Sequence, residues 1–409
     1  MGYNRPDVYI EEILTPEIAP NGVSTSIAAF LGFAQRGPAN QPIFVDSFSA
    51  FKRTFGEAVE NESLYYSVRS FFENGGAACY IVRMIDVSAT EGVATLKAAN
   101  TSIDNQASAD MLKFSAGFRG LPSYGEWGKD LIVKPRKNSS FVNTAVTSDA
   151  AISDTTLSVG STNGLIKGDI IKVTEANNTE HFFKVSGVSS VVEAGVIIRQ
   201  VEVSIPLTVA ITAADSVLEL LSYDLTIELD GEELETFTRL TMNPESDRYF
   251  ETVINDEQVG SRYILVEDLE VGNLISANRE IITGALSSSY ALTTDGQDEK
   301  ANFDLQADLI DSALPSISAK KAINLLCIPP SIDALGGKLP ATDIPVLHAA
   351  MLEFCGNRMD MFAILDAPAG LTASADAVGS VGEYRSTTLG IDTYWGALYY
   401  PSVKMPKVI

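Results

Sequence analysis

The sequence contains little of the chemistry on which enzymes and metal proteins most often depend. Its 409 residues include two histidines, three cysteines and two tryptophans. His181 and His348 fall in different predicted domains, which excludes a His-rich metal site and a histidine pair. Cys79, Cys327 and Cys355 are far apart and embedded among apolar residues, a pattern that indicates buried free thiols.

Long clusters of basic residues are also missing. Acidic residues outnumber basic ones by 53 to 29, and the formal net charge is −24. Nucleic-acid binding usually starts with a basic stripe that releases counterions from phosphate, and anionic lipids attract the same kind of surface. We therefore expect no nucleic-acid partner, and an acidic surface that favours solubility and basic protein partners.

No apolar run is long enough to cross a membrane, since the best stretch, Ile27 to Ala34, is far too short. The first residues lack the charged and then apolar pattern of a secretory signal. Gly2 also lacks the downstream Ser or Thr that myristoylation requires. These absences predict a protein that folds in the cytoplasm and does not insert directly into a membrane.

The first segment, residues 1–22, reads as an extended arm. It contains three prolines, and apolar residues alternate with acidic ones between Val8 and Leu14. A single strand leaves both of its edges unpaired, so we expect the arm to pair with the edge of a sheet, including that of another subunit.

A strand–helix–strand pattern is predicted at both ends of the remaining chain. The first set has a buried strand, a helix with apolar residues at helical spacing that ends at Gly75-Gly76, and a second strand. The second set repeats this order and continues with another helix and strand. The expected elements are strands at 27–33, 79–84, 322–328, 361–366 and 395–400 and helices at 64–72 and 344–355.

The middle of the chain, residues 101–249, carries short β-type runs and is interpreted as an inserted β domain. Its inner part, residues 145–222, is rich in Ser, Thr, Val and Asn and predicts a nested barrel or sandwich. Because both ends of an insertion lie close together, residues 23–100 and 250–409 are expected to form one discontinuous α/β core. The predicted fold class is thus multidomain α/β (α+β).

Two motifs with a possible chemical role have simpler structural interpretations. The acidic segment containing Asp295 and Asp298 lacks the ligand spacing of an EF-hand loop and indicates a solvated turn. Gly336-Gly337-Lys338 resembles the end of a phosphate-binding loop, but Leu339 takes the place of the required Ser or Thr. We therefore expect no metal and no cofactor.

The two histidines and a glycine-rich segment also have structural rather than chemical interpretations. His348 lies beside the apolar face of a predicted helix, and His181 lies in a β run, which indicates packed or surface side chains rather than catalytic ones. Glycines in the segments 117–120 and 125–128 favour tight turns, with Trp127 packed as a lid on the β domain. The sequence thus predicts no catalytic residue and no enzyme activity.

A series of local segments has a pattern that the interpretations above do not account for. These segments are 6–12, 22–32, 37–38, 48–56, 71–76, 80–83, 125–128, 325–329, 354–355 with Arg358 and Asp360, 363–366 and 397–401. They resemble, in the same order, segments of the tail sheath family of contractile phages, pyocins and phage-like injection systems. Asp7 stands where the family usually has glycine, and Lys129 where it usually has asparagine.

The resemblance implies a structural subunit that polymerises as stacked hexameric rings around an inner tube and contracts to drive the tube through a target envelope. Its implied partners are further copies of itself, the inner tube protein, and baseplate and terminator or cap proteins. The implied location is the cytoplasm during assembly and then a phage tail or phage-tail-like particle. Residues 145–222 match nothing general in the family and are expected to be a variable outer decoration.

Extended arms of family members add strands to the sheets of neighbouring subunits, which is the behaviour expected above for residues 1–22. The residues expected to form the intersubunit linking strand are Val8, Tyr9, Ile10, Glu11, Glu12 and Ile13.

Two other functions stay open at this point. Family members continue beyond the strand near Tyr400, whereas this sequence ends at Ile409, which fits a truncated chain, an incomplete sequence or a short paralogue. A non-contractile paralogue or a baseplate-proximal structural protein is therefore an alternative. A hydrolase that uses Asp295, Asp298 or His348 is a third hypothesis, motivated only by the polar character of these residues.

Overall fold

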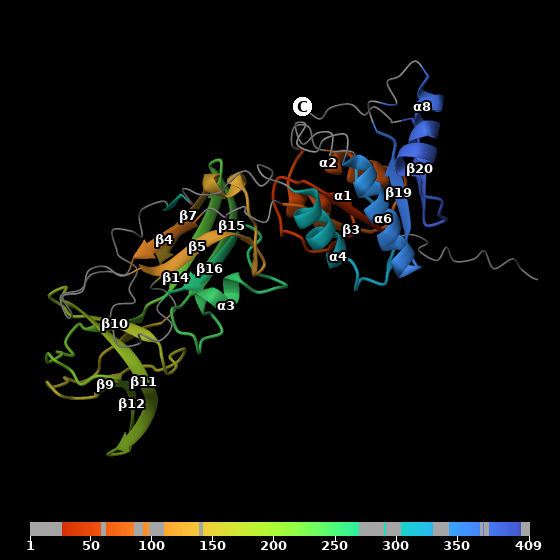
Figure 1. The fold of residues 1–409 in the computed structure, drawn as a ribbon. Helices are drawn as coiled ribbons and strands as arrows, with labels where there is room; N and C mark the ends of the chain where they lie inside the picture. Colours follow the sequence, from red (N-terminus) through yellow and green to blue (C-terminus); the bar gives the residue numbers. More distant parts are fainter. Residues whose placement is uncertain are drawn as a thin grey trace, which may run out of the picture.

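The structure, a computed structural model, describes residues 27–58, 63–85, 93–97, 110–138, 142–269, 290–291, 304–329, 343–368, 371 and 376–401. These residues form three lobes that follow one another along the molecule: an α/β core, a middle β domain and a distal β domain (Figure 1). The expected multidomain α/β (α+β) class is confirmed. The proposed linking strand, residues 8–13, lies outside the described residues.

The core is built on a six-stranded sheet in the order β2-β3-β1-β18-β19-β20. Strand β1 pairs in parallel with both β3 and β18, so strands from the N-terminal and C-terminal parts of the described chain lie side by side at the centre of the sheet. Only β2 runs antiparallel to its neighbour. The strands are β1 (Ile27–Gly32), β2 (Ile43–Val45), β3 (Cys79–Arg83), β18 (Ile323–Cys327), β19 (Phe362–Asp366) and β20 (Gly396–Tyr399).

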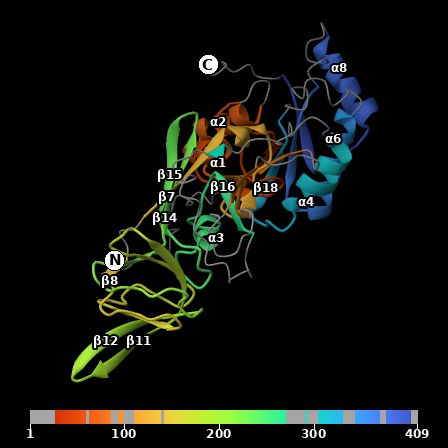
Figure 2. The same ribbon diagram turned by 90° about the vertical axis from the view of Figure 1, so that its left-hand side faces the viewer.

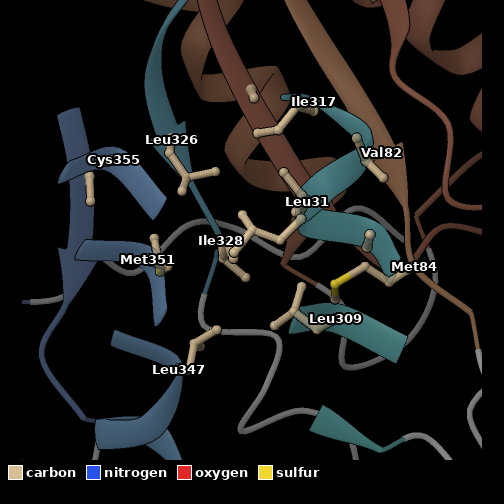
Figure 3. Close-up of a cluster of buried hydrophobic side chains, with 14 of the residues drawn as sticks. Leu31, Val82, Met84, Leu309, Ile317, Leu326, Ile328, Leu347, Met351 and Cys355 are labelled. Carbon is tan, nitrogen blue, oxygen red and sulfur yellow. The ribbon is translucent and has the colours of Figure 1, made fainter. Parts of the chain in front are cut away.

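Helices cover both faces of this sheet. Ala28 and Phe30 of β1 pack with α1 (Phe48–Phe55) and α2 (Leu64–Glu73). Ala29 and Leu31 point to the opposite face, where they join a cluster with side chains of η2, α4 and α6 (Figure 3). Burial on both faces explains why the strands are continuous apolar runs. The helices of that face and of the C-terminal part are η2 (Leu305–Ala313), α4 (Leu314–Ser316), α6 (Ile344–Arg358), α8 (Ala377–Glu383) and η3 (Tyr384–Leu389).

Local sequence signals explain where the first two helices begin and end. The Ser47 hydroxyl accepts a hydrogen bond from the Ala50 backbone N–H at 3.2 Å and so caps α1. Helix α2 ends at Asn74, and Gly75 follows with φ of +91°, a left-handed conformation that costs glycine little. The helix end predicted at Gly75-Gly76 is therefore confirmed.

The middle domain is a sandwich of two sheets, β15-β14-β7-β17 and β16-β5-β4, whose buried side chains form one cluster. Trp127 packs against this cluster, as the sequence predicts. The elements are β4 (Val93–Lys97), β5 (Asp110–Phe118), β6 (Leu121–Pro122), η1 (Glu126–Asp130), β7 (Leu131–Lys137), β14 (Tyr223–Leu229), β15 (Glu232–Leu240), α3 (Phe250–Ile254), β16 (Ile264–Asp268) and β17 (Tyr290–Ala291).

The boundaries of this domain differ from those expected. Strands β4 and β16 lie in the ranges 23–100 and 250–409, which were assigned to the core, yet both pair with β5. Helix α3 likewise buries Phe250 and Ile254 in the middle domain. A short apolar run predicts a strand but does not reveal the strand with which it pairs, so the boundaries 101 and 249 are too narrow on both sides.

The distal lobe corresponds to the predicted nested domain at 145–222. Its sheet has the order β8-β13-β10-β11-β12-β9. The Thr147 N–H donates to the Ser158 carbonyl at 2.8 Å and the Gly160 N–H to the Ala145 carbonyl at 3.0 Å, so the two ends of the sheet meet and close a small barrel. The strands are β8 (Asn143–Ala145), β9 (Thr156–Val159), β10 (Ile170–Thr174), β11 (Glu180–Glu193), β12 (Val196–Val203) and β13 (Val217–Leu220).

Candidate assembly surfaces

A buried arginine joins the core to the middle domain. Arg83, at the end of β3, is completely buried, and its Nε donates to the Ala34 carbonyl at 2.9 Å. Its Nη1 donates to the carbonyls of Gly37 at 3.1 Å and Tyr124 at 3.0 Å. Tyr124 belongs to the middle domain, so one cation fixes backbone from both lobes. Arg83 and Gly37 both lie in segments that resemble the sheath family.

Further contacts strengthen this joint. The Ser123 hydroxyl donates to the Gly37 carbonyl at 3.1 Å and accepts from the Gly37 N–H at 3.0 Å. Arg36 lies over the Tyr263 ring at 5.1 Å and donates to the Arg53 carbonyl at 3.3 Å. Burial lowers the pKa of Arg36. These contacts hold the core and the middle domain together as a block.

The core sheet ends at two outer strands, β2 and β20. Within the described part of the chain, β2 pairs only with β3 and β20 pairs only with β19. An outer strand presents a row of backbone donors and acceptors on its free side, which makes it a template for a strand from another chain. Figure 2 shows the lobe that carries both edges from a second side.

Aromatic side chains surround the β20 edge, where the sequence predicts a strand at 395–400. Tyr394, Tyr399 and Tyr400 are all exposed, Tyr394 by 78%. Gly396 lets β20 approach β19 and α6 closely, because a Cβ at this position would overlap the Leu352 side chain and lie 2.9 Å from the Ala363 carbonyl oxygen. Amphipathic aromatic residues beside a free strand edge are suited to a protein contact.

A cleft of about 530 Å³ lies beside β2, between the core and the middle domain. Arg53 and Phe44 line it from the core, and Arg119 and Arg262 line it from the middle domain. Phe44 is 53% exposed, although its ring contacts Tyr80 edge to face. The cleft thus combines an apolar side chain and three cations beside strand β2.

The histidines that the sequence singled out are not brought together. His348 is buried in α6, its Nδ1 lies 2.9 Å from the Tyr384 hydroxyl, and burial lowers its pKa to about 4. It is therefore neutral at physiological pH and packed as predicted. His181 lies in the distal barrel, with its Nε2 3.6 Å from a Glu175 carboxylate oxygen.

The thiols are suited to packing rather than reaction. Cys79 and Cys355 are buried, Cys327 is half-buried, and burial is the main cause that raises the pKa of all three to about 12. A thiol with such a pKa is almost wholly protonated at neutral pH and is a poor nucleophile.

The other motifs with a possible chemical role, at 295–299 and 336–338, lie outside the described residues, as do Val8, Tyr9, Ile10, Glu11, Glu12 and Ile13. The described residues include no group of His, Cys, Asp or Glu arranged to hold a metal ion. None of the described helices has the length and apolar character needed to span a bilayer.

Sequence reasoning missed the arginines of the cleft. Arg53, Arg119 and Arg262 come from positions far apart in the chain, so no local spacing connects them. Arg119 lies in the glycine-rich segment 117–120, which was interpreted as a turn. Its φ of +47° and the +81° of Gly120 agree with that interpretation, but the turn also directs an arginine to the cleft.

No protein-family model and no curated protein sequence matches this chain. Among solved structures, it is similar to the sheath tail protein from Desulfitobacterium hafniense, with 12% identity, a TM-score of 0.37, and coverage of 88% of this chain and 53% of that chain. A sheath tail protein from Listeria innocua is similar at 10% identity and a TM-score of 0.39, over 83% of this chain and 47% of that chain. This chain thus spans about half the length of these structures.

A weaker likeness, with 14% identity and a TM-score of 0.16, covers 22% of this chain and 15% of a tailspike from the Acinetobacter baumannii bacteriophage AP22. All of these likenesses are distant, so the functional proposal rests on the residues and geometry described above.

Proposed function

We propose that this chain is a structural subunit of a contractile tail sheath, in which copies of the chain form stacked rings around an inner tube and shorten to drive the tube through a target envelope. The observation that carries this proposal is the ordered series of family-like segments. Those at 27–32, 80–83, 325–329, 363–366 and 397–399 are far apart in sequence, yet they fall on five strands of one sheet.

Contraction on this proposal is a rearrangement of rigid blocks, not a chemical reaction. The core and the middle domain, joined through Arg83 and Arg36, move as one block. The arms at residues 1–22 keep neighbouring subunits connected while the blocks rotate, and the energy is stored kinetically when the extended lattice assembles. Such a machine requires no cofactor and no catalytic residue.

The proposed partners follow from this role. They are further copies of the chain, the inner tube protein, and the baseplate and cap proteins at the two ends of the sheath. The subunit would fold in the cytoplasm and reside in a phage tail or phage-tail-like particle.

Electron microscopy of negatively stained protein tests the proposal. The intact chain is expected to form hollow striated tubes, whereas a chain without residues 1–20 is expected to remain as folded monomers, because the linking strand is removed. Normal tubes from the deletion would contradict the role given to the arm.

Point variants provide a sharper version with a matched control. Val8→Asp with Ile10→Asp places two charges in the proposed linking strand and is expected to prevent tube formation. Val192→Asp with Ile197→Asp makes the same change at two exposed positions on the distal barrel, 68% and 58% exposed, and is expected to leave tubes intact. Equal loss in both variants would indicate a general effect of charge rather than a linking strand.

The length and width of the tubes distinguish a contractile sheath subunit from a non-contractile paralogue. A contractile sheath is expected to give two classes of tube, long and narrow or short and wide, with conversion of the first into the second under mild denaturant. A single class under all conditions would favour the non-contractile alternative.

A further inference from the structure

The arginines that line the cleft beside β2 have side-chain donors that the protein does not use. Within the described part of the chain, the guanidinium groups of Arg53, Arg119 and Arg262 form no hydrogen bond and no ion pair. By contrast, the guanidinium group of Arg83 donates to three carbonyls, and that of Arg358 donates to a carboxylate and to backbone carbonyls. The cleft therefore brings together cations whose hydrogen-bonding capacity is free.

The carboxylates near these cations are held by other donors. Glu235 and Asp256 both interact electrostatically with Arg119. Glu235 accepts a hydrogen bond from the Ser261 hydroxyl at 2.8 Å, and Asp256 accepts from the backbone N–H groups two and three residues further along the chain, both at 2.8 Å. Hydroxyl and backbone donors thus fix these carboxylates in place, and the guanidinium donors remain available to a ligand.

The charge of the cleft lining favours an anion. Three arginines are accompanied there by two carboxylates, Asp46 and Glu257, on a chain whose net charge is −24. The Asp46 carboxylate accepts a hydrogen bond from the neighbouring Ser47 hydroxyl at 3.1 Å. Cations gathered in a cleft attract anions more strongly than cations on an open surface, because the low-dielectric walls focus their field. The cleft is therefore a local site of positive charge on an acidic protein.

The cleft is large enough for more than a single ion. Its volume of about 530 Å³ falls within the range of roughly 300–1,000 Å³ that is usual for small-molecule sites. Phe44 and Leu121 add apolar surface to the lining, and Gln41 and Thr54 add an amide and a hydroxyl group. A guanidinium group binds phosphate or carboxylate through parallel N–H donors. Size and lining together fit a small molecule that carries several anionic oxygens.

We propose that the cleft beside β2 binds a small polyvalent oxyanion, of the oligophosphate or polycarboxylate class, whose oxygens accept hydrogen bonds from Arg53, Arg119 and Arg262. Arg53 lies on α1 of the core, whereas Arg119 lies between β5 and β6 and Arg262 lies before β16, both in the middle domain. The ligand therefore connects the two lobes of one chain and stabilises their docked arrangement. The site goes beyond the sheath role and does not depend on it, because a single chain supplies all three arginines.

Single substitutions in the full chain test the site. Arg53→Gln removes an exposed cation from α1, and Arg262→Gln removes a cation from the other lobe. Neither guanidinium group has a hydrogen-bond partner among the described residues, so both variants are expected to fold. The matched control is Arg136→Gln on β7, an exposed arginine outside the cleft whose guanidinium group likewise forms no hydrogen bond within the described residues. Urea unfolding without ligand verifies that each variant is folded.

Isothermal titration calorimetry with tripolyphosphate and with citrate, at constant ionic strength, measures the affinity. The wild type and Arg136→Gln are expected to bind one molecule per chain. Arg53→Gln and Arg262→Gln are expected to bind at least about tenfold more weakly, because each loses hydrogen bonds between a cation and an anion. The anion that binds more tightly identifies the class of ligand. Bound ligand is also expected to raise the urea midpoint of the wild type and to slow proteolysis between the core and the middle domain.

Three results would overturn the site. Equal affinities of Arg53→Gln, Arg262→Gln and Arg136→Gln would show that binding depends on net charge and not on the cleft. No heat of binding and no shift of the urea midpoint with either anion at millimolar concentration would show that the wild type has no such site. Binding that leaves proteolysis between the lobes unchanged would contradict the connection of core and middle domain. Each of these results leaves the sheath function standing, because tube formation is measured separately.

Discussion

Replacement of Arg83 by methionine tests whether this side chain holds the core and the middle domain together. Methionine keeps most of the apolar stem but removes the donors to the carbonyls of Ala34, Gly37 and Tyr124. Gly37 retains the Ser123 hydroxyl as a donor, so its carbonyl stays satisfied. The carbonyls of Ala34 and Tyr124 lose a charged donor in a buried setting.

The size of the effect follows from these losses. A buried acceptor left without its partner costs about 1–3 kcal/mol, so the carbonyls of Ala34 and Tyr124 together cost about 2–6 kcal/mol. We therefore expect Arg83→Met to lower the free energy of unfolding by about 3–5 kcal/mol. Because methionine carries no charge, the variant leaves no unpaired charge buried, and the expected loss lies in the middle of this range.

Urea unfolding followed by circular dichroism measures the stability, and limited proteolysis measures the connection between the lobes. We expect Arg83→Met to unfold at lower urea and to be cleaved faster between core and middle domain. The matched control is Arg69→Met, which removes an exposed guanidinium paired with Glu73 at 2.7 Å on α2 and should change neither measurement detectably. Equal stability of the two variants would contradict the role of Arg83 in holding the core and the middle domain together.

Two further predictions concern the core. The pKa of His348 is about 4 in the folded chain and 6.5 in its ordinary state, so the unfolded chain binds more protons between these two pH values. The free energy of unfolding should therefore fall by up to about 3 kcal/mol as the pH drops from 6.5 to 4. In the variant His348→Gln, the urea midpoint should depend less on pH over this range. Equal pH dependence in both proteins would contradict this. Gly396→Ala should lower the free energy of unfolding by about 1–3 kcal/mol, because the added Cβ overlaps the Leu352 side chain. The control Gly382→Ala in α8 has open space at its Cβ and should not lower this free energy. Thermal or urea unfolding measures both.

The elements of the α/β core could be predicted because their patterns are local. A parallel strand buried on both faces is a continuous apolar run, as in Ile27–Gly32, and a helix repeats its apolar residues every three or four positions, as in Leu64–Glu73. The π-helical segment Leu305–Ala313 was not predicted, since no simple period distinguishes it.

Strand partners were harder to predict than strands. Nothing in Val93–Lys97 or Ile264–Asp268 indicates that both pair with Asp110–Phe118, so the inserted domain is larger than expected. The same limit applies to the cleft, where Arg53, Arg119 and Arg262 meet only after the middle domain docks on the core. The linking strand at residues 8–13 stays a prediction from pattern and resemblance.

The acidity of the chain bears on how such subunits join. Copies that each carry a net charge of −24 repel one another, but at physiological ionic strength this repulsion is screened beyond about 8 Å. Contacts within that distance therefore decide whether subunits associate. Strand addition is suited to this situation because its backbone hydrogen bonds require no net charge.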